Sequence, residues 1–284
     1  MKRWYTEKEI IKIIGRYDAV IAGLDPFTAN VLKESSNLKL IARRGIGYDN
    51  IDVKAARELG IKVSTTPIPE EHASVAEFTI TLMLSLLRNI TFANASLKTG
   101  SWEREKFVGK GMTDVSIGVV GLGHIGRRVA QMAERLGAKV TYYDPYVQDQ
   151  EFRSVATLAE LFEHSDLVTL HVPHTSETHE MVNSTVLERM KHGSYLVNTC
   201  RAEVVNTRDF KRALRDGTLA AAALDVFEEE PPSKTDPLLR IRNLIVTPHI
   251  AAGTLASFSK MDEICVDSVI RVLVENEEPQ FRVV

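Results

Sequence analysis

Short apolar runs alternate with helical patterns over the first part of the chain. Apolar residues at helical spacing predict a helix over residues 6–15, with Thr6 as its N-cap and Glu9 at the capping-box offset. The pattern then predicts strand 18–22, helix 28–33, strand 38–43, helix 51–59 and strand 62–64. This alternation indicates a small parallel α/β domain. Such a domain normally opens on a strand, so we expect this one to lack its first strand, either through loss from this sequence or because this version is trimmed.

Residues 74–89 differ from the rest because they are apolar almost all round. A helix of that kind is buried in a core or in a subunit interface. We expect both, with one face on its own domain and another on a second copy of the chain; a purely internal helix is the alternative. The prolines at 67 and 69 mark a domain boundary just before this helix. An irregular stretch is predicted over 100–114, with Trp102 as an anchoring apolar contact.

The alternation resumes at residue 115. It predicts a strand–turn–helix–strand unit over 115–144, then helix 157–163, strand 167–171, helix 184–189, strand 194–198, helix 207–216, strand 220–226 and strand 243–247. About six strands with crossover helices are typical of a doubly wound parallel sheet, the Rossmann arrangement, expected here over residues 72–254. A long amphipathic helix over 256–276 follows. We therefore predict that the doubly wound domain is inserted in the smaller one, which comprises residues 1–71 and 255–284.

The unit at 115–144 contains the turn Gly121-x-Gly123-x-x-Gly126 between its first strand and its helix. Gly121 permits the tight turn, Gly123 lets the backbone approach a pyrophosphate, and Gly126 lets the helix lie close to the strand. The helix N-terminus favours the negative phosphates. Asp144 ends the second strand, where an acid can accept hydrogen bonds from the adenosine ribose. An acid there repels the 2′-phosphate of NADP, so NAD is the favoured cofactor.

The bulk composition excludes several classes of function. The chain has 38 acidic and 35 basic residues and a net charge of −3, which gives no sign of nucleic acid or membrane-surface binding. Its two cysteines lack metal-ligand spacing, so we expect no metal site and a reducing, cytoplasmic location. No apolar run reaches the ~18–20 residues of a membrane span. The charged N-terminal stretch MKRWYTEKEI lacks the apolar core of a signal peptide.

Three side chains with catalytic potential follow successive strands of the larger domain. Arg201 follows VNTC, Glu230 closes DVFEEE, and His249 closes IVTPH. The carboxyl ends of parallel strands are where ligands bind in such sheets. An arginine grips a carboxylate bidentately, a histidine exchanges protons near neutral pH, and a carboxylate beside it favours the protonated ring and fixes its tautomer. Each residue alone is most often structural, but their joint placement predicts acid/base chemistry on an acid substrate.

These motifs together resemble the D-isomer-specific 2-hydroxyacid dehydrogenases over nearly the whole chain. The matching stretches are RRGIGYDNID (43–52), ASVAEFT (73–79), GVVGLGHIGRRVA (118–130), residues 171–183, VNTCRAEVVN (197–206), AALDVFEEEP (222–231) and NLIVTPHIAAGT (243–254). The resemblance implies an NAD-dependent oxidoreductase with a flavodoxin-like substrate domain. In it Arg201 binds the substrate, Glu230 is the carboxylate partner and His249 is the acid/base.

The resemblance also implies binding residues. The small-domain loop Arg43, Arg44, Gly45, Ile46 and Gly47 is similar to the loop that meets the substrate carboxylate. Cofactor contacts are implied for Val75, Gly121, Gly123, His124, Ile125, Gly126, Asp144, Val172, Thr199, Cys200 and Asp225. The family is usually dimeric through the cofactor domain, in agreement with the apolar helix at 74–89. The sequence departs from the family at its first strand, at Ala202-Glu203 where glycine is usual, and in the lead-in VGKGMTDVS.

The substrate is left open by the resemblance. Two arginines at 43 and 44 could hold a phosphate, which favours a 3-phosphoglycerate-type acid; the alternatives are glyoxylate and hydroxypyruvate, and ion pairs of these arginines with the protein. The characteristic insertions of formate dehydrogenases are not seen. A further alternative, of another class, is a non-catalytic NAD-binding protein such as a corepressor. The complete set of arginine, glutamate and histidine argues against it.

Overall fold

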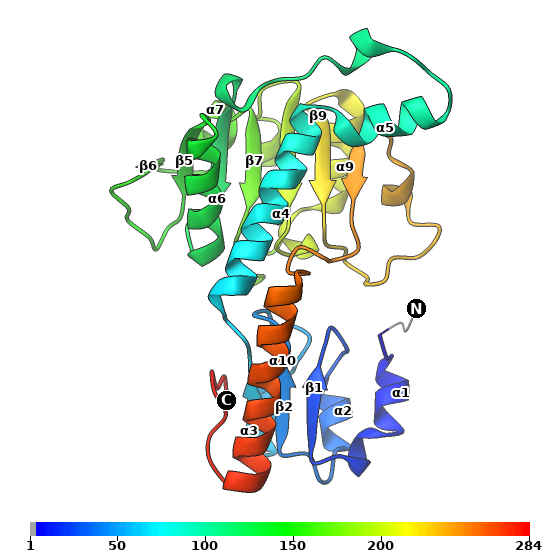
Figure 1. Cartoon of the computed structure of the whole chain (residues 1–284), viewed down its shortest axis with the longest axis vertical. Helices are drawn as coiled ribbons and strands as arrows, with labels where there is room; N and C mark the ends of the chain where they lie inside the picture. The colour runs from blue at the N-terminus through cyan, green and yellow to red at the C-terminus, as the bar shows by residue number, and fades with distance from the viewer. Residues whose placement is uncertain (1–3) are drawn as a thin grey trace. The chain divides into compact units, whose positions relative to one another are not determined.

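The computed structural model describes residues 4–284 and divides into two compact units. One unit comprises Met1–Glu71 with Gly253–Val284, and the other is His72–Ala252 (Figure 1). The first boundary lies where the sequence predicts it, and the second lies two residues earlier than expected. The chain thus starts and ends in the smaller unit, and the larger unit is inserted between its two segments.

The smaller unit contains a three-stranded parallel sheet in the order β1-β2-β3. Its strands are β1 (Ala19–Ala22), β2 (Leu40–Arg43) and β3 (Lys62–Ser64). Helices α1 (Glu7–Ile11), α2 (Ala29–Lys33) and α3 (Val53–Glu58) share a core with Ile41 and Val63. Helix α10 (Leu255–Ile270) packs through Cys265 against Leu40 and Ala42, whose side chains alternate with that of Ile41 along β2. Within the described residues this unit opens on α1, as expected, and β1 pairs only with β2.

The ends of the smaller unit differ in detail from the prediction. The expected helix over 6–15 is α1 followed by a separate 3-10 turn, Ile14–Arg16, although the Thr6–Glu9 capping box forms as predicted. The expected helix over 256–276 ends at Ile270 and continues as the π-helical turn Arg271–Glu275. The chain end then lies antiparallel to β3, where Val283 donates to the Val63 carbonyl at 2.7 Å.

The larger unit contains a seven-stranded parallel sheet in the order β10-β9-β8-β7-β4-β5-β6. Its strands are β4 (Ser116–Val120), β5 (Lys139–Tyr143), β6 (Arg153–Ser154), β7 (Leu167–Leu170), β8 (Ser194–Asn198), β9 (Leu219–Leu224) and β10 (Leu244–Val246). The two-residue β6 was not predicted. The chain winds outward from β4 through β5 and then returns to β7 on the other side, so the crevice for a ligand lies where the order reverses, between β4 and β7.

Helices cover both faces of this sheet (Figure 1). On one face, α4 (Pro69–Leu87) and α6 (His124–Arg135) share a core with Ile117, Val119 and Val197. On the other face, α7 (Leu158–His164), α8 (Ser184–Leu187) and α9 (Thr207–Asp216) pack on Val120, Leu196 and Ala222. Neighbouring strand residues thus point to opposite cores, which is why the strands read as continuous apolar runs.

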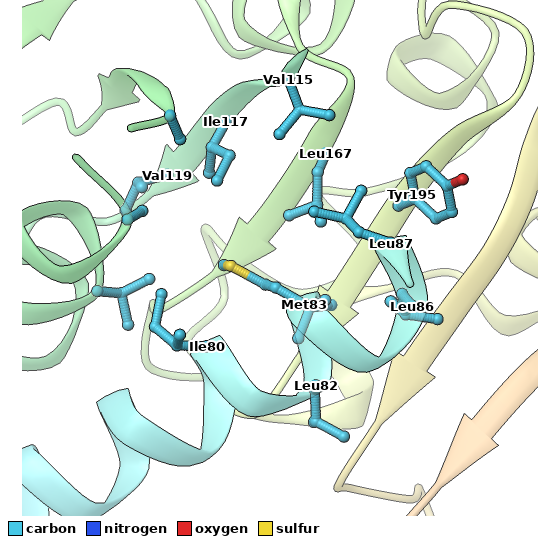
Figure 2. Packing of buried hydrophobic residues seen from close by; sticks show 14 of the residues in the cluster. Ile80, Leu82, Met83, Leu86, Leu87, Val115, Ile117, Val119, Leu167 and Tyr195 are labelled. Carbon is cyan, nitrogen blue, oxygen red and sulfur yellow. The ribbon is translucent and has the colours of Figure 1, made fainter. Parts of the chain in front are cut away.

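Helix α4 is the apolar helix that the sequence singles out. Figure 2 shows Ile80, Met83 and Leu87 directed at Ile117, Val119 and Leu167 of the sheet. It begins at Pro69, five residues before the predicted start, with proline at a helix start where its missing N–H costs nothing. Most of its large apolar residues are buried within the unit, and Phe78 and Leu84 are partly exposed. The helix therefore has a large internal face and a small external one.

A second helix, α5 (Ile90–Lys98), follows α4 and was not predicted. It has no buried residue, and its Ile90 and Leu97 are more than half exposed. Two 3-10 turns, Arg104–Phe107 and Met112–Asp114, interrupt the stretch expected to be irregular. Trp102, expected as an anchor, is 77 % exposed within the chain. Among residues 4–284 no single helix is long and apolar enough to cross a membrane; α4 and α5, bent by 59°, pass that test only as a pair.

Candidate active site

The three glycines of the turn after β4 form a cradle. The first and last of them have no room for a side chain, whereas the middle one faces open space. Gly121 has φ +87°, and a Cβ on it would lie 2.5 Å from the carbonyl oxygen of His171. A Cβ on Gly126 would lie 2.0 Å from the Gly121 carbonyl oxygen, so α6 packs directly on the turn. A Cβ on Gly123 would meet nothing within 4 Å, and Gly123 is the N-cap of α6. The open position faces the helix N-terminus, and the cradle thus fits a dinucleotide pyrophosphate.

Asp144, at the end of β5, holds the cradle through its carboxylate. Its Oδ2 accepts from the N–H of Leu122 at 2.8 Å, inside the glycine turn. Its Oδ1 accepts from the N–H groups of Tyr146 and Val147 at 2.9 and 3.1 Å. A carboxylate offers about four acceptor positions, so one remains for a ribose hydroxyl. Asp144 therefore fixes the turn in addition to its predicted role at the ribose.

His171 and Val172 form the opposite wall of the crevice, after β7. The His171 ring contacts the Thr169 hydroxyl through Nε2 at 2.9 Å, and burial lowers the pKa of His171 to about 3. The ring is thus neutral at physiological pH. Val172 lies against the glycine turn, where a Cβ on Gly121 would come within 2.8 Å of its Cγ1. The predicted cofactor residue Val172 therefore lies beside the cradle.

The turn after β8 carries Thr199, Cys200 and Arg201, and the fully buried Asn198 fixes it. The Asn198 side chain donates to the Arg201 carbonyl at 2.7 Å and accepts from the Cys200 N–H at 2.9 Å. Thr199 is hydrogen-bonded to Thr79 of α4 at 2.9 Å, and Thr79 in turn donates to the Val75 carbonyl. The sequence places Asn198 at a strand end where functional side chains are expected, and the structure gives it the task of fixing this turn. Hydrogen bonds through Thr79 thus join the predicted residues Val75 and Thr199, and Cys200 follows Thr199 in the turn that Asn198 fixes.

Glu230 and His249 meet as the sequence predicts. Glu230 Oε2 lies 2.7 Å from His249 Nδ1, and Glu230 Oε1 accepts from the Phe227 N–H at 3.1 Å. A carboxylate on Nδ1 leaves Nε2 for a substrate. His249 has φ +52°, a left-handed backbone conformation that is uncommon for residues other than glycine. Strained residues of this kind are common at functional sites.

Asp225, at the end of β9, holds the loop that carries His249. It is fully buried, and its carboxylate accepts from the Ile250 and Ala251 N–H groups at 3.0 and 2.8 Å and from the Thr247 hydroxyl. Burial raises the pKa of Asp225, while these hydrogen bonds act in the opposite direction. The sequence placed Asp225 at the cofactor. In the structure its carboxylate accepts hydrogen bonds from Thr247, Ile250 and Ala251, which all lie in the loop 247–251, so Asp225 also positions His249.

The loop Arg43–Gly47 belongs to the smaller unit, where β2 ends. Gly45 has φ +139° and donates to the Thr66 hydroxyl at 2.8 Å. The buried Arg43 donates to the Arg44 carbonyl and lies against Gly45. Arg44 forms a two-point ion pair with Asp262 of α10, with its guanidinium 4.1 Å above the Phe258 ring. Arg44 thus forms an ion pair with the protein, which was the alternative to phosphate binding, and Arg43 is engaged by a backbone carbonyl.

The remaining predicted residues, His124 and Ile125, begin α6. Ile125 packs on the core beneath the sheet, whereas His124 is exposed and stacked on His72 of α4. No group of three metal-ligating side chains occurs within residues 4–284. The larger unit alone therefore holds the dinucleotide cradle, the arginine turn and the glutamate–histidine pair.

Known proteins that are similar to this chain agree on its class. The model of the D-isomer-specific 2-hydroxyacid dehydrogenase NAD-binding domain matches residues 80–251. The hydroxypyruvate reductase of Thermotoga maritima is 38% identical over 269 residues, which cover 93% of this chain and 88% of the relative. The glyoxylate reductase of Thermofilum pendens is 36% identical, with 94% and 82% covered. The D-3-phosphoglycerate dehydrogenase of Archaeoglobus fulgidus is 36% identical over 96% of this chain, which spans about half (52%) of the relative's length.

Solved structures give the same result. TT0316 protein from Thermus thermophilus superimposes with a TM-score of 0.89 at 34% identity, covering 98% of this chain and 89% of the other. D-lactate dehydrogenase from Aquifex aeolicus, complexed with NAD and lactic acid, has a TM-score of 0.83 at 32% identity, with 94% and 86% covered. The fold and these matches define a protein with a doubly wound, NAD-binding domain. Within that class, the chain belongs to the D-isomer-specific 2-hydroxyacid dehydrogenases.

Proposed function

We propose that this protein transfers a hydride between NAD(H) and a short 2-hydroxy or 2-oxo acid. The observation that carries the proposal is the Glu230–His249 pair at 2.7 Å, on the sheet that also holds the open glycine cradle. An acid/base pair beside a dinucleotide site is the minimum equipment for reversible oxidation of an alcohol. Arg201 supplies the charge that an acid substrate requires.

Each side chain has a distinct task in the proposed reaction. The bound nicotinamide supplies the hydride for reduction and accepts it in oxidation. Arg201 holds the substrate carboxylate and polarises the carbonyl. His249 Nε2 delivers a proton to the carbonyl oxygen, and Glu230 stabilises the imidazolium while it is charged. One 2-oxo acid, one hydride and one proton thus give one 2-hydroxy acid, and the reverse reaction returns the proton to His249.

For the substrate, we propose glyoxylate or hydroxypyruvate ahead of a 3-phosphoglycerate-type acid. A phosphate group on the substrate would be held by Arg43 and Arg44 only if both guanidinium groups were available to it. Arg44 is paired with Asp262 and stacked on Phe258, and Arg43 is buried beside Gly45. The Gly45 N–H already donates to the Thr66 hydroxyl, so we propose that a substrate carboxylate is met by the backbone N–H groups that follow it, at Ile46 and Gly47. A small unphosphorylated acid requires nothing more from this loop.

We also propose that the protein is a cytoplasmic homodimer that associates through the larger unit. The support is a set of exposed apolar side chains on and after α5: Ile90, Leu97, Trp102 and Val108. Several large apolar side chains exposed within one short stretch of the chain favour an interface there. Sedimentation velocity tests the dimer, and a monomer at micromolar concentration would contradict it.

A substrate panel tests the activity. NADH oxidation is followed at neutral pH with glyoxylate, hydroxypyruvate, 3-phosphohydroxypyruvate and pyruvate. We expect the highest kcat/KM with glyoxylate or hydroxypyruvate. A clear preference for the phosphorylated acid would reverse the substrate assignment. Tight NADH binding with no turnover on any acid would instead favour a non-catalytic NAD-binding protein.

A further inference from the structure

A cavity outside the proposed catalytic site lies in the larger unit, where the start of α9 meets the segment that follows β9. Its volume is about 340 Å³, within the ~300–1,000 Å³ that is typical of small-molecule pockets. Its lining includes Thr207 and Lys211 of α9 and Val226 and Phe227 after β9. Of the described residues, neither the proposed catalytic trio nor the glycine turn belongs to this lining. The cavity is therefore separate from the proposed substrate and cofactor sites.

Much of the lining is apolar. Six of the residues that line the cavity are buried apolar side chains of the larger unit: Val205, Phe210, Leu224, Val226, Phe227 and Leu238. Covering such a surface with an apolar group removes it from water, which is favourable. An occupant of this cavity thus needs an apolar body.

Lys211 supplies the positive charge of the cavity. Among the described residues that line it, Lys211 is the only cation, and this residue is half-buried. Within residues 4–284 its ammonium group has neither an ion pair nor a hydrogen bond, whereas the neighbouring Arg212 is paired with Glu188 at 2.8 Å. A half-buried ammonium without a partner gains from an anionic group that accepts its hydrogen bonds. The occupant should therefore carry a negative charge next to its apolar body.

Two carboxylates also line the cavity, and both already accept hydrogen bonds. The exposed Glu228 accepts from the Thr207 hydroxyl, and Asp236 accepts from the Leu238 N–H at 2.8 Å. Their charges limit how much negative charge an occupant can bring, because like charges repel. The lining thus fits a single carboxylate better than a phosphate or a dicarboxylate.

The cavity also touches two residues that hold the proposed catalytic groups. Phe227 lines it and donates its N–H to Glu230 at 3.1 Å. Asn198 lines it and donates to the Arg201 carbonyl at 2.7 Å. An occupant that packs on Phe227 therefore restrains the segment that carries Glu230, whose carboxylate lies 2.7 Å from His249.

We propose that this cavity is an effector site for a small monocarboxylic acid with a branched or aromatic apolar body. The carboxylate of the acid binds the Lys211 ammonium, and its body packs on the buried apolar lining. The cavity accompanies the arrangement in which Glu230 and His249 are paired, and a ligand shifts the population toward the arrangement that it binds. The bound acid therefore increases turnover. Binding of the acid is independent of the proposed function, whereas its effect on turnover rests on that function.

Isothermal titration of phenylacetate into the full chain, without NADH or an acid substrate, tests the site. We expect a Kd of about 1 mM or tighter for an acid of this size. Lys211→Met keeps a long apolar side chain but removes the charge, so it should bind phenylacetate about tenfold more weakly. Phenylacetamide has nearly the same shape without the charge and should bind weakly to both proteins. Isovalerate, which has a branched body, should follow phenylacetate.

Three further variants separate this site from general effects of charge. Lys234→Met is the matched control: Lys234 is exposed between the lining residues Ser233 and Thr235 but does not line the cavity, so the variant should bind as the wild type does. Thr235→Trp places a large ring at an exposed position of the lining and should abolish binding although Lys211 is intact. Glu228→Gln removes a like charge and should bind phenylacetate more tightly.

Turnover of glyoxylate at saturating NADH tests the effector role. Phenylacetate should raise kcat in the wild type and leave it unchanged in Lys211→Met. Equal affinity of the wild type and Lys211→Met would place the acid elsewhere and overturn the proposal, as would no binding up to about 10 mM. A kcat that stays constant or falls at saturating phenylacetate would overturn the effector role. The expected binding pattern in a protein without any turnover would support the site and contradict only the proposed function.

Discussion

Two regions of this protein carry arginines that could hold an acid, and the structure treats them differently. In the larger unit, Arg201 stands on a turn fixed by Asn198, at the same sheet edge as the glutamate–histidine pair. In the smaller unit, Arg44 is bound by Asp262 and covered by Phe258. The guanidinium of Arg201 donates to the Cys200 carbonyl at 2.8 Å. The guanidinium of Arg44 is paired with a carboxylate of its own unit, so the sequence position of Arg44 alone is weak evidence for binding an acid.

The comparison predicts that the largest losses come from the larger unit. Replacing His249 by Ala removes the proposed proton donor, so kcat should fall by about 10²- to 10⁴-fold while the Kd for NADH is unchanged. Steady-state kinetics with glyoxylate and a fluorescence titration of NADH measure the two quantities. Glu230→Gln is the matched variant: it keeps the shape of the pair but not the charge, and its rate should fall less. A His249→Ala enzyme with wild-type turnover at neutral pH would remove His249 from the mechanism.

A smaller loss is expected at Asp225, which touches no reacting atom in the proposed mechanism. The Asp225 carboxylate accepts hydrogen bonds from the N–H groups of Ile250 and Ala251. In Asp225→Asn the amide nitrogen takes the place of one carboxylate oxygen, so it sets a donor against one of these two donors. The loop that holds His249 should shift, and a misplacement near 1 Å costs up to about 100-fold in rate. The free energy of unfolding should also decrease by about 1–3 kcal/mol, measured by urea denaturation.

Thr247→Val provides the control for this loop. It removes one of the three hydrogen bonds to Asp225 without placing a donor against a donor. Its effect on rate and stability should therefore be weaker than that of Asp225→Asn. If the two variants were equally active and Asp225→Asn were as stable as the wild type, the loop would not depend on Asp225.

The residues at the edge of the larger sheet could be predicted from sequence because each strand is marked by a short stretch of consecutive residues. Each strand is a short apolar run, and parallel strands bring their ends to one edge, so Glu230 and His249 had to lie near each other. The glycine cradle follows from three glycines in one turn. These features need no knowledge of how distant elements pack.

The features that sequence reasoning missed depend on contacts between distant residues. Arg44 and Asp262 are separated by 218 positions, and their pairing requires α10 to lie on the sheet of the smaller unit. The stack of His72 on His124 requires α4 to dock beside α6. Helix α5 has no buried residue, so the pattern of apolar positions gave it no signal. Whether a charged side chain is free to bind a ligand thus depends on its tertiary contacts.

The smallest predicted effect tests the second region directly. Asp262→Asn removes the charge that neutralises Arg44 but leaves the stacking on Phe258. If the loop meets the substrate as proposed, the KM for 3-phosphohydroxypyruvate should fall by about threefold to tenfold, since one free cation gains about one contact to a phosphate. The KM for glyoxylate should stay constant. Stability should change by only about 0–1 kcal/mol, because the ion pair is partly exposed. Glu263→Gln neutralises a carboxylate paired with Lys260 on the same helix and is the matched control. If both variants changed the two KM values equally, the effect would be one of net charge, and Arg44 would have no specific part in substrate choice.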